Sequence, residues 1–288
     1  MSALQIVGVH GIKQGSAGTT RSLSERWQES LDEALDAAPE GAARVVMTVP
    51  SYQAVFPRTP TRFMRLGGPD GGVLSGDTPI GKEEEAFILA ALAAYAPSAV
   101  EDEASTATLG ERTLTPRIVR RMQAVDRKLG KGVTGHLLWF VREAHAYLRK
   151  EETAAAVRAT VAKALAETGA PFVIAHSLGS VVFYDMLRRG EAPGVTTLVT
   201  CGSPLGWLAD RRGIHSEGEP LTVPAGVEWT NLHATKDVVT GCAGLSRFAA
   251  GITDVEVYNG SGFPSSHDVH RYLDKPALAE LIIKAHTA

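Results

Sequence analysis

The sequence predicts an α/β fold in which a mostly parallel central sheet is covered by helices on both faces. Short apolar runs of strand length alternate with helix-length amphipathic stretches over residues 4–50 and again over 171–285. The chain has 288 residues, 44% apolar and 21% charged, which is ordinary for a globular protein with a substantial core. We therefore expect one α/β domain over residues 1–288.

A strand–helix–strand unit opens the chain. Residues 4–9 form a short apolar run that ends at His10-Gly11, and residues 45–49 form a second run of the same kind. Between them, a Ser-Leu-Ser-Glu capping-box pattern precedes apolar residues at helical spacing, which predicts an amphipathic helix over 22–38. Both strands are expected to be buried.

Residues 51–150 interrupt this alternation. A stretch rich in glycine and proline covers 51–80, and such long irregular segments in compact domains are often functional. Helical patterns with no strand between them follow at 82–96, 116–129, 134–150 and 153–168. We interpret 51–150 as a largely helical insertion within the domain, a cap or lid over one face of the core.

From Pro171 to the end of the chain the strand–helix alternation resumes. Apolar runs predict strands at 172–175, 195–201, 227–234 and 255–258. A helix is expected over 178–189, and Pro276 opens a final helix because proline is favoured in the first turn. These strands are expected to complete the parallel sheet.

Charge, hydropathy and cysteine content exclude several classes of function. Lys and Arg number 29 against 32 Asp and Glu, so nothing in the chain as a whole attracts nucleic acid or an anionic membrane. The start of the chain lacks the features of a signal peptide, and the most apolar helical stretch, 87–96, has about half of the roughly 20 residues that a membrane span needs. A cytoplasmic protein without a transmembrane segment is expected. Cys201 and Cys242 form neither a disulfide framework nor a zinc-binding pattern, and a single bridge between them is left open.

The pattern with the clearest chemical meaning is FVIAHSLGS at 172–180. An apolar strand runs through Ala-His-Ser-Leu-Gly directly into an apolar helix, which is the context of a nucleophile elbow. Small residues at Ala175 and Gly179 suit a strained turn that lifts the Ser177 hydroxyl above the sheet edge. The N-terminus of the following helix favours developing negative charge. Ser177 is therefore the candidate nucleophile.

With this elbow the sequence resembles the lipase- and esterase-like branch of the α/β-hydrolase superfamily, departing from its usual G-x-S-x-G only at Ala175. A second match is VGVHGI at 7–12, similar to the His-Gly that ends a strand upstream of the elbow in many such hydrolases. The resemblance implies an oxyanion hole of backbone N–H groups from the loop at Gly11 and Ile12 and from Leu178, the residue after the nucleophile. The insertion carries no such match.

In this superfamily the acid and the base follow the nucleophile in the order Ser, Asp or Glu, His. The segment EWTNLHATKDVV at 228–239 resembles the family's W-x-N…D-x-V, which implies that Asp237 orients the histidine. Asp210 and Asp254 are weaker candidates, because neither directly follows a convincing buried strand.

Three histidines lie downstream of that aspartate and are candidates for the base. His286 is two residues from the C-terminus, where chain ends are commonly frayed. The segment before the final helix resembles a family ending in which the catalytic histidine stands shortly before Tyr-Leu, here Tyr272-Leu273. This spacing favours His267, with His270 as the alternate.

These residues together imply a serine hydrolase that cleaves a carboxylic ester of a small molecule or lipid through Ser177, His267 and Asp237, with no metal or organic cofactor. The segment CGSPL at 201–205 resembles a family turn that shapes the floor of the site, and we assign it a structural role. The same fold also serves acyltransferases and non-catalytic binding proteins, which remain the alternatives. The identity of the ester, its acyl length and the oligomeric state do not follow from the sequence.

Overall fold

A computed structural model describes residues 2–11, 18–38, 43–56, 80–95, 115–130, 133–206, 208, 221–241, 243–260 and 262–287. The chain divides into two compact units. The first consists of Met1–Val55 with Glu151–Ala288, and the second of Phe56–Lys150. The boundary of the second unit lies close to that of the insertion expected at 51–150.

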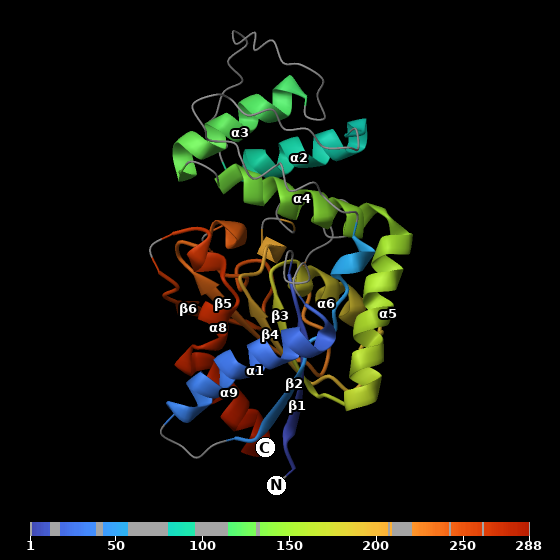
Figure 1. The fold of residues 1–288 in the computed structure, drawn as a ribbon, viewed down its shortest axis with the longest axis vertical. Coiled ribbons are helices and arrows are strands. Elements are labelled where there is room, and N and C mark those ends of the chain that lie inside the picture. The colour runs from blue at the N-terminus through green and yellow to red at the C-terminus, as the bar shows by residue number, and fades with distance from the viewer. Residues whose placement is uncertain are drawn as a thin grey trace. The chain divides into compact units, whose positions relative to one another are not determined.

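The first unit is built on a six-stranded sheet in which every neighbouring pair is parallel, in the order β2-β1-β3-β4-β5-β6 (Figure 1). The strands are β1 (Leu4–Val9), β2 (Val45–Thr48), β3 (Phe172–His176), β4 (Thr197–Cys201), β5 (Glu228–Ala234) and β6 (Ile252–Val257). The predicted α/β class is confirmed. Strand order reverses between β1 and β3, and in open parallel sheets such a reversal opens a crevice at the carboxyl ends of the strands.

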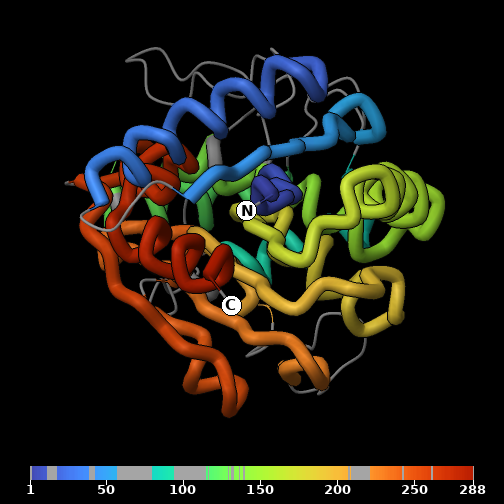
Figure 2. The backbone as a smooth tube through the Cα atoms, turned by 90° about the horizontal axis from the view of Figure 1, so that it is seen from below, coloured from blue at the N-terminus to red at the C-terminus, as the bar shows by residue number. Residues whose placement is uncertain are grey.

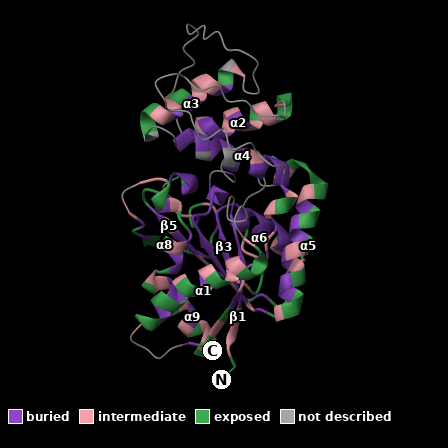
Figure 3. Cartoon of the chain, in the orientation of Figure 1, coloured by how far each residue is buried: buried purple, intermediate pink, exposed green. Residues whose placement is uncertain are grey.

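Helices cover both faces of the sheet (Figure 2). On one face α1 (Thr20–Asp36) packs against β2, α8 (His270–Leu273) and α9 (Pro276–Thr287). On the other, α5 (Glu151–Thr168) and α6 (Leu178–Arg188) pack against each other and against β1. The edge strands β2 and β6 are only partly buried, and Val46 on β2 is 44% exposed, so the burial expected for the strand at 45–49 is incomplete. The central strands β3 and β4 are buried along almost their whole length, as Figure 3 shows for β3. This accounts for their apolar sequences, since strands covered on both faces lose the polar alternation.

Helix α1 presents one apolar stripe to the core, with Trp27 and Leu31 fully buried. Its predicted start is corrected: Thr19 is the N-cap, and its hydroxyl accepts from the Ser22 N–H at 3.3 Å. Ser22 is already inside the first turn, and its own hydroxyl donates back to the Thr19 carbonyl at 3.2 Å. The first N–H groups of a helix have no partner within the helix, and a nearby serine or threonine side chain can accept from them. Here Thr19, three residues before Ser22, takes this role.

A buried arginine connects α5 to α6 through an ion pair. Arg158 on α5 is 5% exposed and bonds Asp185 on α6 at 3.2 Å, Glu151 at 2.6 Å and Glu191 at 3.0 Å. Removing one partner of a buried ion pair typically costs about 3–5 kcal/mol because the other charge is left unpaired. The network therefore holds α6 in a defined place beneath the site.

In its described residues, every element of the second unit is a helix: α2 (Lys82–Tyr95), α3 (Pro116–Leu129) and α4 (Val133–Arg149). The three helices contact one another through buried apolar side chains such as Ile88, Met122 and Leu137. Arg142 on α4 pairs with Glu84 on α2 at 2.6 Å. The helical content expected for the insertion is thus present, while its role as a cap or lid stays a prediction.

Among the residues described in these two units, no helix is both long and apolar enough to cross a membrane. The same residues hold no group of three or more His, Cys, Asp or Glu side chains arranged to bind a metal ion.

Candidate active site

The candidate site lies at the carboxyl ends of the strands, where the strand order reverses. Ser177 follows β3, and His10-Gly11 follows the neighbouring β1. Asp237 comes three residues after β5, and His267 ends a short 3-10 helix (Ser265–His267) in the loop after β6. Because parallel strands bring all their carboxyl ends to one edge, segments far apart in sequence meet here.

Ser177 stands in a strained turn. Its backbone has φ 55° and ψ −125°, and it is the only non-glycine with positive φ in the part of the chain that the structure describes. Such a conformation costs on the order of 1–3 kcal/mol and persists only where the surroundings impose it. The surroundings here are tight: a Cβ on Gly179 would stand 2.0 Å from the Val9 carbonyl oxygen. The turn therefore has the geometry expected of a nucleophile elbow.

A hydrogen-bond chain connects the three residues predicted to form the catalytic centre. His267 Nε2 lies 2.9 Å from Ser177 Oγ, and His267 Nδ1 lies 2.8 Å from Asp237 Oδ2. Since a carboxylate only accepts, Nδ1 carries the proton of the neutral imidazole and Nε2 accepts from the serine hydroxyl. Ser177 is 1% exposed and Asp237 fully buried. The arrangement can therefore draw the hydroxyl proton towards His267.

Asp237 is held by more than the histidine. It caps the short 3-10 helix Val238–Thr240, and the Val239 N–H donates to its Oδ1 at 3.0 Å. The Tyr272 hydroxyl donates to Oδ2 at 2.7 Å. Burial first, and then the charge of Asp237, raise the pKa of Tyr272 well above 10, so this hydroxyl stays protonated and donates. Sequence reasoning used Tyr272 only as a landmark for the base and missed this contact.

His176, the residue before the nucleophile, contacts the loop that carries the base. Its Nε2 lies 2.9 Å from the backbone carbonyl oxygen of His267, and the two rings are 4.8 Å apart. Burial lowers the pKa of His176 well below 6.5, so the ring is neutral and donates through Nε2–H. Sequence reasoning counted His176 only as part of the elbow motif.

Two of the three residues predicted to form the oxyanion hole lie beside the nucleophile. Leu178 is the first residue of α6, where a backbone N–H has no partner within the helix. Gly11 runs directly against Ser177: a Cβ at position 11 would stand 2.6 Å from Ser177 Cβ and 3.1 Å from Ser177 Oγ. Only glycine allows this approach. Ile12 lies outside the described residues.

His10 holds the segment that carries Gly11. Its ring stacks on Tyr52 with centroids 3.9 Å apart, and its Nδ1 lies 2.7 Å from the Gly11 carbonyl oxygen. The Tyr52 hydroxyl donates to the His10 carbonyl, and the Tyr52 backbone N–H approaches His10 Nε2 at 3.4 Å. Burial lowers the pKa of His10 to about 4, with the bond to Gly11 opposing the shift. His10 is therefore neutral near pH 7, with Nδ1 as donor.

The turn after β4 forms the floor of the site, in agreement with the structural role expected for CGSPL. Gly202 has φ 57° and lies against both Asp237 and His267. The Ser203 hydroxyl bonds the Ser180 hydroxyl at 2.8 Å, and Ser180 in turn donates to the Ser177 carbonyl at 2.6 Å. The turn after β4 is thus hydrogen-bonded, through Ser180, to the turn that carries Ser177.

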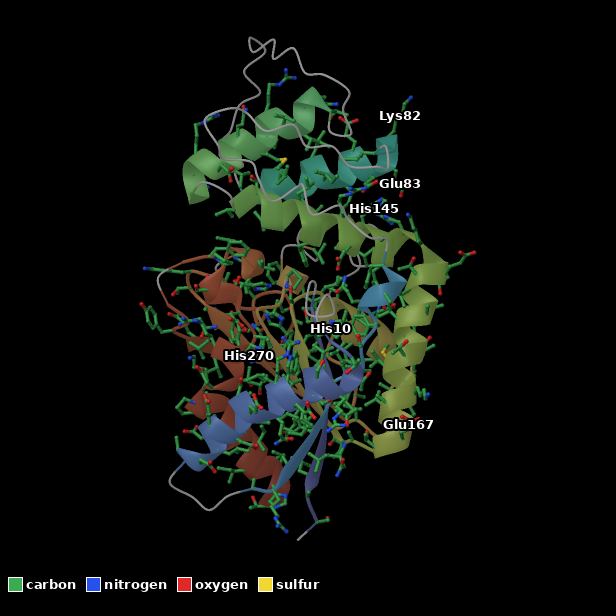
Figure 4. All side chains as sticks on the ribbon, in the orientation of Figure 1. His10, Lys82, Glu83, His145, Glu167 and His270 are labelled. Atoms are coloured by element: carbon green, nitrogen blue, oxygen red, sulfur yellow. The ribbon has the colours of Figure 1, made fainter. Side chains whose placement is uncertain are left out.

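The alternative acid and base candidates lie elsewhere. His270, labelled in Figure 4, is the first residue of α8, and its Nδ1 bonds the Ser30 hydroxyl on α1 at 2.7 Å. Asp254 accepts from the Leu245 and Ser246 N–H groups and from the Asn231 amide. These bonds lower the pKa of Asp254 although burial, the largest single influence, would raise it. His270 and Asp254 are thus committed to bonds with other residues.

The remaining candidates do not join the site. His286 lies in α9 next to its final residue. Cys201 is a free, buried thiol, and burial raises its pKa, so it is a poor nucleophile. Asp210 and Cys242 lie outside the described residues.

In comparisons with known proteins, no family model, curated protein or solved structure matches this chain.

Proposed function

We propose that the chain is a serine hydrolase that cleaves a carboxylic ester. One observation carries the proposal: the continuous hydrogen-bond chain from Ser177 through His267 to Asp237, with Ser177 in a strained turn at the carboxyl edge of the sheet. A serine, a histidine and a buried carboxylate in this order form a general base and an activated nucleophile.

In the acylation half of the reaction, Ser177 Oγ attacks the ester carbonyl carbon while His267 Nε2 takes the hydroxyl proton. The tetrahedral adduct collapses with cleavage of the bond to the alkoxy oxygen, and His267 returns the proton to the departing alcohol. In the second half, His267 takes a proton from water, and the resulting hydroxide equivalent attacks the acyl carbon. The carboxylic acid leaves and the proton returns to Ser177.

Asp237 and the backbone donors supply the electrostatic part of the mechanism. The buried carboxylate of Asp237 keeps His267 in the productive tautomer and stabilises the imidazolium. The negative oxygen of the adduct develops near the N-terminus of α6, where Leu178 N–H is available, and opposite Gly11. Losing one donor of this kind typically lowers the rate by about 10²–10³-fold.

A fluorophosphonate probe, combined with a panel of p-nitrophenyl esters of increasing acyl length, tests the proposal. We expect one covalent label, mapped to Ser177 by peptide mass spectrometry, and hydrolysis of at least one ester. The Ser177→Ala variant is expected to lose both. The control is Ser265→Ala, which removes an exposed hydroxyl in the loop of the base and should leave both intact. Absence of label and hydrolysis in the folded wild-type protein overturns the proposal in favour of a binding protein.

A further inference from the structure

One oxygen of Asp237 serves two donors. His267 Nδ1 lies 2.8 Å from Asp237 Oδ2, and the Tyr272 hydroxyl donates to the same atom at 2.7 Å. Hydrogen bonds to an ionised carboxylate are about twice as strong as neutral ones. The two donors therefore compete for the charge on one oxygen, in a place where both Asp237 and Tyr272 are fully buried.

The direction of the Tyr272 hydroxyl is determined by a second bond. The Ala234 backbone N–H donates to the hydroxyl oxygen at 3.2 Å, which leaves the hydroxyl proton directed at Asp237. The ring is packed in the core between α1, α9 and the ends of the strands. Tyr272 thus links the end of β5 to the carboxylate that follows it.

We propose that Tyr272 is a positioning residue that, through the shared Oδ2 of Asp237, lowers the proton affinity of His267. Its hydroxyl neutralises part of the carboxylate charge that would otherwise bind the imidazolium more tightly. A base with lower proton affinity returns its proton to the leaving alcohol more readily, so the contact favours the step that expels the alcohol. The part of this inference that concerns catalysis rests on the proposed function, whereas the coupling of Tyr272 to His267 does not.

Other titratable groups stand on the elements around the Asp237–His267 pair, and one of them, His270, directs its Nδ1 to Ser30. They are His10 after β1, His176 on β3, Cys201 on β4, and Asp268 and His270 on either side of the N-cap of α8. Burial lowers the pKa of His10 and His176 and raises the pKa of Cys201, so these three are uncharged near pH 7. All five groups are unchanged when Tyr272 is substituted, so their contributions cancel in the comparison below.

The test compares Tyr272→Phe with Tyr184→Phe. Tyr184 is an equally buried tyrosine on α6 whose hydroxyl accepts from the Thr222 N–H at 2.8 Å, away from the site. Each variant deletes one buried hydroxyl that accepts one backbone N–H, and only Tyr272→Phe also removes a bond to a carboxylate. Urea denaturation of both variants confirms that each is folded under the conditions of the titration. The readout is the pKa of His267, measured by NMR titration of the imidazole in isotope-labelled protein, which needs no substrate.

We expect the pKa of His267 to rise in Tyr272→Phe by on the order of half a unit, because the carboxylate loses the donor that offsets its charge. Tyr184→Phe should leave the His267 pKa at its wild-type value. The acid limb of kcat/KM should move in the same direction, with KM nearly unchanged. An unshifted His267 pKa in Tyr272→Phe, or an equal shift in Tyr184→Phe, overturns the inference.

Site-specific 3-fluorotyrosine at position 272 keeps the test decisive if Tyr272→Phe does not fold. The ring and the hydroxyl remain, but the hydroxyl becomes a stronger donor, so the His267 pKa should fall. A rise or no change contradicts the inference. A shifted titration in a protein that hydrolyses no ester supports the coupling and overturns the proposed function. An unshifted His267 titration in an enzyme that hydrolyses esters overturns the coupling and supports the proposed function.

Discussion

Gly202 lies in contact with the carboxylate of Asp237. A Cβ built at position 202 would stand 3.0 Å from Asp237 Oδ2 and 3.1 Å from His267 Nδ1, and the backbone there has φ 57°. The glycine therefore meets two requirements at once. It allows a left-handed turn after β4, and it leaves room for the aspartate–histidine pair to lie directly against the chain.

Gly202→Ala is expected to displace this pair and to lower kcat by about 10–100-fold, since small misplacements of catalytic groups are costly. KM should change little. Gly190→Ala is the matched control: Gly190 has φ 68° and no heavy atom within 4 Å of a built Cβ. In both variants alanine must adopt a left-handed backbone conformation, which costs about 1–2 kcal/mol of stability. Only Gly202→Ala should lose activity. Steady-state kinetics with urea unfolding separates the two effects, and equal kcat in both variants contradicts the contact argument.

Replacing Ser177 distinguishes catalytic from conformational effects. Ser177→Ala keeps a Cβ at φ 55° and therefore keeps the backbone strain, whereas Ser177→Gly relieves it. We expect both variants to be inactive and Ser177→Gly to be the more stable by about 1 kcal/mol, because relief of strain exceeds the added chain entropy of glycine. Urea denaturation measures the difference. A more stable alanine variant would show that the turn is unstrained.

The two nearby histidines are expected to respond very differently to substitution. His267→Ala removes the group that contacts both Ser177 and Asp237, and should lower kcat by on the order of 10⁴-fold. His270→Ala removes a bond to Ser30 on α1 and should leave kcat within about threefold while costing about 1 kcal/mol of stability. Rates are compared at a temperature where both variants are folded. A near-wild-type rate for His267→Ala would transfer the role of base to His270.

Burial of His10 predicts that stability falls in mild acid. Its pKa is about 4 in the folded protein against the 6.5 that is ordinary for histidine, so between these pH values the unfolded chain binds the extra proton. The stability that neutral His10 contributes is then fully present above pH 6.5 and is lost as the pH falls towards 4. From pH 7.5 to 5.0 this one group should cost about 2 kcal/mol of unfolding free energy. Urea denaturation of wild type and His10→Gln at both pH values measures it, and an unchanged pH dependence in His10→Gln refutes the assignment.

The α/β class and the turn at Ser177 could be predicted from the sequence. Both depend on local patterns: apolar runs of strand length, helical periodicity, and a strand that passes through Ala-His-Ser-Leu-Gly into a helix. Such patterns act over a few residues and are legible without knowing what packs against them. The same holds for the structural role of the turn at Gly202, which a Gly-Ser-Pro run already indicates.

Which distant side chains meet depends on how the elements pack, and local patterns do not show it. His267 and His270 are three residues apart, and only the path of the loop after β6 directs one ring to Ser177 and the other to Ser30. The Tyr272 hydroxyl reaches Asp237 because α8 packs against the end of β5. These contacts join segments separated by tens to hundreds of residues, and they depend on packing between elements. Periodicity and turn chemistry carry no information about such packing, because it is set by the combined shape of all the buried side chains.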